Sequence, residues 1–331
     1  MKLGILGSGK IVKELLPVLE EIDEIEVVAI SARNEDKLKR LAKEYDIPKY
    51  YLGIDELLAD SKVEVVYVGL PNDLHYEAMK MAIEANKDII CEKPFTSNAY
   101  ESQRIIELAK DKGVLVLEAL TNRFIPNAIK VKEKLNELGD IKIVSFNYSQ
   151  YSFRYDNFKK DIIEPVFTLE HSGGALMDLN LYNVAYVVEL FGKPKDVKYF
   201  ANIEKDIDTS GILALDYGDF KAVCIGSKDS QAPLVNTIQG TKATIEIPDA
   251  LNSFSKFSLK KLSRSKSKSF NFNDDSKSRL YYEFVEFEQI IKTRDKDRAD
   301  KLLESTRDYM EVISRARFSA NIFYPADREL S

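Results

Sequence analysis

The sequence predicts an α/β protein: an N-terminal Rossmann domain with a doubly wound parallel sheet, then a C-terminal α/β domain with an open, mainly antiparallel sheet. Two observations carry this prediction. Up to about residue 120, short apolar runs alternate with amphipathic stretches of helical length, as expected for a parallel sheet covered by helices on both faces. From residue 197, longer alternating runs follow one another with few helical stretches between them, which indicates antiparallel strands.

The first half contains five expected strands, at 2–6, 26–31, 63–68, 88–91 and 114–118. The third of these runs is β-branched and nearly continuous in apolarity, which is typical of a strand buried on both faces. Pro126 opens a further helical pattern, and Gly139 gives it a stop signal before a strand at 141–148. We therefore expect two domains, at 1–122 and at 123–331.

The second half contains expected strands at 197–203, 211–217, 220–225, 237–239 and 243–247, and expected helices at 175–190, 279–293 and 298–318. These helices would cover one face of the sheet. The other face needs a partner, so we expect a homodimer or a dimer of dimers. The Ser/Lys-rich stretch 253–278 is interpreted as a solvated edge hairpin whose lysines protect the sheet edge.

Composition excludes several classes of protein. Of 331 residues, 44% are hydrophobic and 31% charged, and the net charge of −6 is spread without long blocks, so a nucleic-acid partner is not expected. There is neither a membrane-spanning apolar run nor a signal layout, and we expect a cytoplasmic protein. Cys91 and Cys224 are interpreted as buried thiols. No metal is expected, because two histidines and two cysteines lie far apart in the sequence.

A glycine-containing turn directly follows the first expected strand. Gly7-Ser8-Gly9-Lys10-Ile11 opens an amphipathic helix; small residues there let the backbone approach a pyrophosphate, and the helix N-terminus supplies N–H donors. Val12 replaces the third glycine of the usual fingerprint, which is expected to widen the helix-to-strand packing slightly. The position between a strand and a helix favours a dinucleotide site over a simple tight turn.

The end of the second strand bears on the choice between NAD and NADP. An Asp or Glu there would hold both ribose hydroxyls of NAD, but this strand ends in Ser31-Ala32-Arg33. Arg33 and Lys37 lie one helical turn apart and can bind a 2′-phosphate through charge-assisted hydrogen bonds. We expect NADP(H) to be preferred and NAD(H) to be accepted as well. The alternative is two exposed basic residues at a helix start.

Two further motifs resemble a known family. Pro71-Asn72-Asp73-Leu74-His75 is followed by Cys91-Glu92-Lys93-Pro94, and the pattern continues through 173–182. Together they resemble the signature of the Gfo/Idh/MocA oxidoreductases, and most of all the branch of NADP-dependent dimeric dihydrodiol and xylose dehydrogenases. The resemblance implies a Rossmann domain followed by a mixed α/β domain whose open sheet mediates dimerisation.

The resemblance also implies cofactor contacts for Leu70, Pro71, Asn72, His75, Glu92 and Lys93. Asn72 would face the nicotinamide end, and Glu92 would orient the local backbone or pair with a base. For His75, a capping or packing role in the first helical turn is the stronger alternative.

Oxidation of an alcohol requires a group that takes the hydroxyl proton as hydride leaves. We assign proton transfer to Tyr182, with Lys93 as its electrostatic partner, because a neighbouring ammonium favours the phenolate. Asp178 lies four residues before Tyr182 on the same helix face, and is expected to position substrate hydroxyls or tune Lys93. Structural alternatives are a helix-start charge for Asp178 and a core aromatic for Tyr182. Pro94 restricts Lys93 to extended backbone, and the bond between them is left open as cis or trans.

Arg123, His171 and Phe153 are the candidates for substrate contacts. Relatives in the dihydrodiol and xylose branch carry a Trp where this chain has Thr121, and the chain has no Trp at all. The missing aromatic platform places sugars and polyols ahead of aromatic diols as substrates.

The sequence therefore predicts an NAD(P)-dependent oxidoreductase that moves a hydride between nicotinamide and a sugar, polyol or cyclic diol carbon. Two alternatives stay open. One is a dinucleotide-binding sensor without chemistry; the other is a reductase of C=N or C=C bonds, similar to biliverdin reductase.

Overall fold

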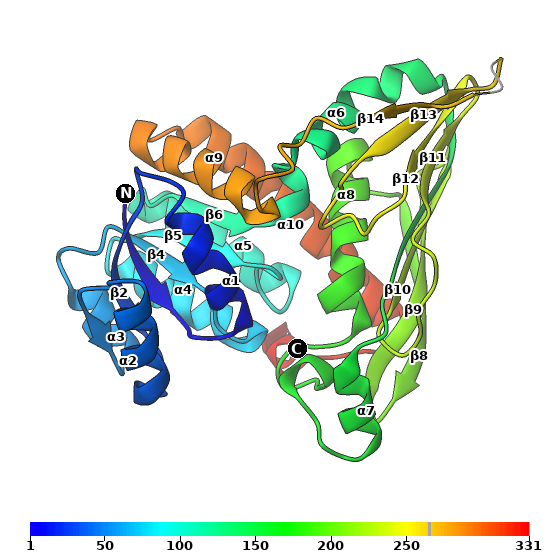
Figure 1. The fold of residues 1–331 in the computed structure, drawn as a ribbon. Coiled ribbons are helices and arrows are strands. Elements are labelled where there is room, and N and C mark those ends of the chain that lie inside the picture. Colours follow the sequence, from blue (N-terminus) through cyan, green and yellow to red (C-terminus); the bar gives the residue numbers. More distant parts are fainter. Residues whose placement is uncertain (264–265, 331) are drawn as a thin grey trace. The chain divides into compact units, whose positions relative to one another are not determined.

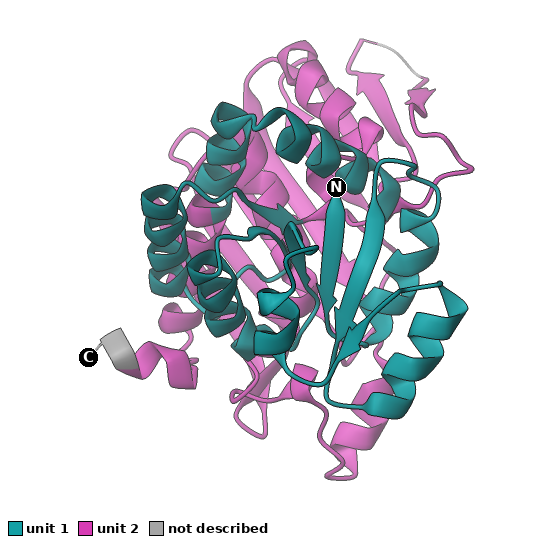
Figure 2. Cartoon of the chain, turned by 90° about the vertical axis from the view of Figure 1, so that its left-hand side faces the viewer, with its two compact units in different colours: residues 1–119, 280–306 teal, residues 120–279, 307–331 magenta. Residues whose placement is uncertain are grey.

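The computed structural model describes residues 1–263 and 266–330. The chain forms two compact units, shown in Figure 2. Unit 1 comprises Met1–Ala119 and Leu280–Thr306, and unit 2 comprises Leu120–Arg279 and Arg307–Ser331. The first division falls within three residues of the expected boundary. The segment 280–306, however, groups with unit 1 and not with the second half of the chain.

Unit 1 is built on a six-stranded parallel sheet of order β3-β2-β1-β4-β5-β6. Its strands are β1 (Lys2–Leu6), β2 (Glu26–Ser31), β3 (Tyr50–Tyr51), β4 (Val65–Val68), β5 (Asp88–Glu92) and β6 (Val116–Ala119). Its first five helices are α1 (Lys10–Leu19), α2 (Glu35–Glu44), α3 (Ile54–Ala59), α4 (His75–Glu84) and α5 (Ala99–Lys112). The strand order reverses between β1 and β4, so the carboxyl ends of these strands form the crevice where ligands bind in such sheets. The predicted Rossmann fold is confirmed.

Two helices from the end of the chain differ from expectation in their packing. They occur where the sequence predicts them, as α9 (Arg279–Thr293) and α10 (Lys296–Ser319). Yet α9 belongs to unit 1, where the ring of Phe284 lies 5.8 Å from that of Tyr67. Thr306 of α10 donates a hydrogen bond to Glu118 at 2.8 Å within the same unit. The expectation that both helices cover the second sheet is therefore wrong for α9 and for the first half of α10.

Unit 2 contains an eight-stranded sheet of order β14-β13-β12-β11-β7-β10-β9-β8. Its strands are β7 (Ile141–Ser149), β8 (Asp196–Glu204), β9 (Ile207–Asp216), β10 (Lys221–Ser227), β11 (Asn236–Gly240), β12 (Ala243–Ile247), β13 (Phe257–Lys261) and β14 (Lys268–Phe270). Strand β10 runs parallel to β7, and the other described neighbours are antiparallel. The predicted antiparallel sheet is confirmed. The expected edge hairpin corresponds to β13 and β14, while Arg264 and Ser265 of that stretch lie outside the described residues.

The helices of unit 2 lie on one side of its sheet. They are α6 (Pro126–Lys134), α7 (Phe153–Lys159) and α8 (Leu181–Phe191), to which the second half of α10 is added. A five-residue π turn, Leu176–Asn180, leads directly into α8. Figure 1 shows α6 and α8 against one face of the sheet, whereas no described helix of unit 2 covers the opposite face. Among the described residues, no helix has both the length and the apolarity that crossing a membrane requires.

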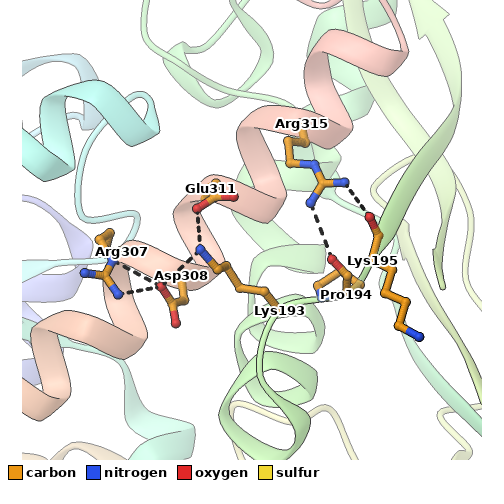
Figure 3. Close-up of polar contacts among 7 residues, drawn as sticks. All are labelled: Lys193, Pro194, Lys195, Arg307, Asp308, Glu311 and Arg315. Atoms are coloured by element: carbon orange, nitrogen blue, oxygen red, sulfur yellow. Dashed lines mark hydrogen bonds and ion pairs between the residues drawn. The ribbon is translucent and has the colours of Figure 1, made fainter. Parts of the chain in front are cut away.

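The loop that follows α8 forms hydrogen bonds and ion pairs with α10, as Figure 3 shows. Lys193 forms an ion pair with Glu311 at 2.7 Å. Arg315 donates to the carbonyl oxygens of Pro194 at 3.4 Å and Lys195 at 3.1 Å. These contacts fix the connection between α8 and β8 within unit 2.

Candidate active-site residues

The turn between β1 and α1 is shaped for close approach of a ligand. Gly7 has φ of +117°, and a Cβ there would lie 2.2 Å from the carbonyl oxygen of Gly69, so no other residue fits. Gly9 is the N-cap of α1, is exposed, and a Cβ added to it would meet nothing within 4 Å. The helix thus begins with accessible N–H groups beside an open backbone surface, which fits the pyrophosphate of a dinucleotide.

Val12, which replaces the third glycine, is fully buried. The room for its side chain comes from Gly69, directly after β4, because a Cβ at Gly69 would lie 3.1 Å from Val12 Cγ2. A glycine on the neighbouring strand end therefore serves the close packing that the fingerprint assigns to the third glycine.

The end of β2 presents two basic side chains. Arg33 and Lys37 are exposed, and within residues 1–263 and 266–330 neither side chain forms a hydrogen bond or an ion pair. Asn34 caps α2 by accepting from the Lys37 backbone N–H at 2.9 Å. Ser31 is buried and its hydroxyl donates to the carbonyl oxygen of Gly53 at 3.0 Å. The guanidinium of Arg33 and the ammonium of Lys37 are thus available at the end of β2, where a 2′-phosphate would bind.

His75 joins the loops that follow β4 and β5. Its ring is fully buried, with Nδ1 2.8 Å from the Pro94 carbonyl oxygen and Nε2 2.9 Å from that of Leu70. Burial lowers the pKa of His75, although the two carbonyl contacts oppose that shift. The peptide bond between Lys93 and Pro94 is cis. These contacts favour the packing alternative for His75, which holds the backbone that carries Leu70 and Lys93.

Glu92 is buried at the end of β5 and accepts a hydrogen bond from the Tyr67 hydroxyl at 2.6 Å. Burial, together with the Glu92 carboxylate, raises the pKa of Tyr67 well above its ordinary value. Asn72 begins the 3-10 turn Asn72–Leu74 and is half-buried. Because Tyr67 lies in a continuous apolar run, its bond to Glu92 was not predictable from the residue pattern.

Unit 2 carries Asp178 and Tyr182 on successive turns. Asp178 lies in the π turn and Tyr182 is the second residue of α8, a junction of the kind often found at functional sites. Tyr182 is 6% exposed. Its carbonyl oxygen accepts from Asn122 at 2.9 Å, and its ring lies 6.1 Å from that of Tyr148. The predicted continuous helix at 175–190 is therefore a π turn followed by an α-helix.

The Asp178 carboxylate has a cationic partner that sequence analysis missed. Lys228 Nζ lies 2.6 Å from Asp178 Oδ2, and the lysine side chain is 2% exposed against 30% for the aspartate. The two residues are 50 positions apart in the chain. Lys228 directly follows the apolar and small residues of β10. A lysine at the end of such a buried strand is the sequence signal that could have identified it.

The start of the π turn is held by buried polar contacts. Asp208 on β9 accepts from the backbone N–H of Leu176 at 2.7 Å and from the Tyr199 hydroxyl at 2.9 Å. Gly174 has φ of +106°, and a Cβ there would lie 2.0 Å from Asp208 Oδ1. Burial raises the pKa of Asp208 to about 6. Gly174, just before the turn, is therefore required for close packing on Asp208.

Two asparagines attach the π turn and α8 to β10. Asn180 donates to the Cys224 carbonyl oxygen at 3.0 Å, and Asn183 donates to that of Ile225 at 3.0 Å. Both asparagines are fully buried. Polar side chains inside an apolar helical stretch were a signal that sequence analysis did not use.

The three candidate substrate residues lie in different surroundings within unit 2. Arg123 is 8% exposed and its guanidinium lies 5.6 Å from the centre of the Tyr309 ring. His171 is half-buried, and its backbone N–H donates to Thr168. Phe153 begins α7 and is 71% exposed.

The described contacts thus form two groups. The phosphate turn, Arg33, Lys37 and the His75-anchored loop with Lys93 share unit 1, whereas Asp178 and Tyr182 share unit 2.

The chain is similar to known oxidoreductases. Residues 1–120 match the GFO_IDH_MocA model, described as an oxidoreductase family with an NAD-binding Rossmann fold. The chain is 30% identical over 340 residues to the NADP(+)-dependent scyllo-inositol 2-dehydrogenase IolU of Bacillus subtilis, covering 99% of both chains. It is 33% identical to an NADP(+)-dependent D-xylose 1-dehydrogenase of Haloferax volcanii, covering 76% of this chain and 77% of the relative.

A solved structure shares the fold. It is a 3-ketoreductase from Actinomadura kijaniata, in complex with TDP-benzene and NADP, with a TM-score of 0.82 at 20% identity over 96% of this chain and 97% of that chain. Sequence identity along the full length, the family match and the two sheets lead to one conclusion: the chain belongs to the Gfo/Idh/MocA family and is an NAD(P)-dependent oxidoreductase.

Proposed function

We propose that the chain transfers a hydride between the nicotinamide of NADP(H) and a hydroxyl-bearing carbon of a sugar, polyol or cyclic diol. The full-length similarity to a scyllo-inositol dehydrogenase carries this proposal. Relatives that act on D-xylose and on trans-1,2-dihydrobenzene-1,2-diol support the same substrate class. Because the chain has no Trp, sugars and polyols are placed ahead of aromatic diols.

NADP(H) is the proposed cofactor. The scyllo-inositol and D-xylose dehydrogenases that resemble this chain are NADP(+)-dependent, and the end of β2 offers Arg33 and Lys37 where an NAD-binding acid would stand. The turn Gly7-Ser8-Gly9 would hold the pyrophosphate at the start of α1.

In the proposed reaction, the bound nicotinamide supplies the hydride acceptor. Tyr182 takes the proton of the substrate hydroxyl, and Lys93 stabilises the phenolate and the developing charge on the substrate oxygen. Asp178 accepts hydrogen bonds from neighbouring substrate hydroxyls. Further substrate contacts are proposed for Arg123, His171 and Phe153, each of which can be tested by substitution.

The test measures NADP reduction with a panel of inositols, aldoses and cyclic diols. We expect Lys93→Met and Tyr182→Phe each to lower kcat by about 10² to 10⁴-fold on the best substrate, the range typical of a lost proton-transfer group. Lys110→Met, on the exposed side of α5, is the matched control and should be unchanged.

Other outcomes would point to the alternatives. If both variants match the wild type on a good substrate, the mechanism is wrong. Reduction of imines or tetrapyrroles with every alcohol inert would favour a C=N or C=C reductase. Tight NADP binding without turnover of any substrate would favour a sensor. In a crystal with NADP and a polyol, Lys93 and Tyr182 more than ~10 Å apart would also exclude their joint action.

Unit 2 also offers the surface for the proposed homodimer, because one face of its sheet carries no described helix. The division of roles between a dinucleotide-binding part, 1–122, and a substrate-binding part, 123–331, and the cytoplasmic location stay predictions from the sequence.

A further inference from the structure

We propose that Lys228 is a positioning residue of this enzyme, which holds the Asp178 carboxylate in the orientation in which it accepts hydrogen bonds from the substrate. The inference rests on the proposed function, since it concerns how Asp178 receives substrate hydroxyls. Lys228 itself contacts no substrate in this proposal and acts through Asp178.

The ammonium of Lys228 is enclosed by its own unit. It lies 2.6 Å from Asp178 Oδ2, 3.4 Å from the Val166 carbonyl oxygen and 4.6 Å from the centre of the Phe167 ring. Its side chain is 2% exposed. Lysine is rarely buried to this degree unless it is paired. The Asp178 carboxylate, the Val166 carbonyl oxygen, the face of the Phe167 ring and the buried Asp208 all contribute to stabilising its charge.

The backbone of Lys228 is fixed on both sides. Its N–H donates to the Thr209 carbonyl oxygen at 2.8 Å, and its carbonyl oxygen accepts from the Ser152 N–H at 2.9 Å. The next residue, Asp229, accepts hydroxyl hydrogen bonds from Thr209 at 2.7 Å and from Ser227 at 2.8 Å. Burial opposes ionisation of Asp229, but these hydroxyls hold its pKa below the ordinary value. The chain segment that presents the ammonium is thus rigidly attached to β9 and β10.

The two side chains of the Lys228–Asp178 pair differ in exposure. This difference distinguishes a role in positioning Asp178 from a role in stabilising the fold alone. The lysine is enclosed while 30% of the aspartate side chain remains accessible. Buried ion pairs contribute little net stability compared with apolar residues of similar volume. If the pair only stabilised the fold, two apolar side chains would serve as well. An accessible carboxylate that accepts hydrogen bonds, in contrast, needs a fixed cationic partner to hold its orientation. Asp178 also lies in the π turn, a backbone irregularity of the kind often found at functional sites.

The experiment compares Lys228→Met, Lys228→Arg, Asp178→Asn and the double variant Lys228→Met/Asp178→Asn in the full chain. On the best polyol we expect Lys228→Met to lower kcat about 10 to 100-fold, the effect of a displaced positioning group, with the KM for NADP unchanged. Lys228→Arg should restore part of the loss, because it keeps the charge. Lys221→Met is the matched control: Lys221 is the first residue of β10, the strand that Lys228 follows, and it forms an exposed ion pair with Asp216 at 2.9 Å.

The double variant tests whether Lys228 works through Asp178. If it does, adding Lys228→Met to Asp178→Asn causes no further loss of kcat, since the two effects are not additive. This comparison also stands if Lys228→Met alone fails to fold, because the double variant leaves no unpaired buried charge. A further drop in the double variant, or wild-type kinetics of Lys228→Met, would overturn the proposal.

Failure of the proposed function gives a different result. If Asp178→Asn itself turns over polyols like the wild type, the assignment of Asp178 is wrong, and the inference about Lys228 is overturned with it. If Asp178→Asn is impaired and Lys228→Met is not, the proposed function stands and only this inference fails.

Discussion

Asp208 is a single residue whose ionisation links pH to the stability of the π turn in the candidate site. It is buried on β9 and holds the first N–H of the π turn that carries Asp178. A carboxylate in such a place is costly in its ionised form, which is why burial raises its pKa to about 6. The same carboxylate accepts from Leu176 and Tyr199, so the ionised group still organises its surroundings.

The first prediction concerns stability against pH. Because the folded-state pKa of Asp208 is about 6 against 3.8 for the free side chain, the folded protein binds a proton more tightly than the unfolded chain. Its contribution to stability is fully present below pH 3.8 and is lost as pH rises through 6, by about 3 kcal/mol for two pKa units. Asp208→Asn should remove this loss, since an amide keeps an acceptor for Leu176.

The measurement is urea unfolding of both proteins at about pH 4.5 and about pH 7.5, on either side of the shifted pKa. Circular dichroism is the signal, because the chain has no tryptophan. The gain of the variant over the wild type should grow by about 2 kcal/mol between these two pH values, because about 1 kcal/mol of the total is already lost at about pH 4.5, above the pKa of 3.8 of the free side chain. Parallel pH profiles would contradict the shifted pKa of Asp208.

The second prediction concerns the choice of cofactor. Arg33→Ala should raise the KM for NADP about tenfold to 100-fold and leave the KM for NAD nearly unchanged, because only NADP carries the phosphate that a guanidinium binds with charge-assisted bonds. Arg40→Ala, on the exposed side of the helix that follows, is the control. Equal affinity of the Arg33 variant for NADP would remove Arg33 from the site.

Single residues also mark the limit of what the sequence could tell. The turn Gly7-Ser8-Gly9 could be predicted because small residues are needed directly after a strand, and the Lys93-Pro94 motif was identified through the family resemblance. Lys228, Asp208 and Tyr67 were not, since their partners lie 50, 32 and 25 positions away. A contact across that distance follows from strand pairing and packing, which periodicity does not report.

At the scale of elements, the prediction was best where the hydrophobic period was regular. β1 and β2 have the predicted bounds, and α9 spans the predicted residues. The two-residue strand β3 and the short helix α7 were missed, because segments of two and seven residues carry too few positions for a period. The packing of α9 in unit 1 was also missed, since an amphipathic pattern shows that a face is buried and not what buries it.

The third prediction tests how closely the π turn packs on β10. A Cβ at Gly226 would lie 2.6 Å from the Asn180 Cβ, an atom attached directly to the backbone. Gly226→Ala should therefore destabilise the fold by about 1 to 3 kcal/mol through overpacking, and should lower kcat because Asp178 shares the displaced turn. Gly53→Ala is the control, since its added Cβ would be 3.9 Å from the nearest atoms. Equal urea midpoints and equal kcat for the Gly226 variant and the wild type would show that the turn tolerates the methyl group.

At the scale of the whole molecule, the feature that bears on assembly is the face of the unit 2 sheet that none of the described helices of unit 2 covers. Phe200, Ile212 and Ile225 lie side by side across β8, β9 and β10. Phe200 is 61% exposed and Ile212 is 47% exposed. An antiparallel sheet can face water with polar side chains, but a row of large apolar ones indicates an interface.

The last prediction follows from this row. If two copies of the chain pair through the sheet face, Ile212→Lys places a charge in the centre of the interface, where it cannot be solvated, and the dimer should dissociate. Light scattering after gel filtration should give a mass near that of the 37.7 kDa chain for the variant and twice that for the wild type. Val285→Lys, which alters an apolar residue of unit 1 that is 40% exposed, should leave the dimer intact. A wild-type protein that is monomeric at micromolar concentration, or a variant that stays dimeric, would show that this face is not the interface, and the exposed row of apolar side chains would then need another occupant.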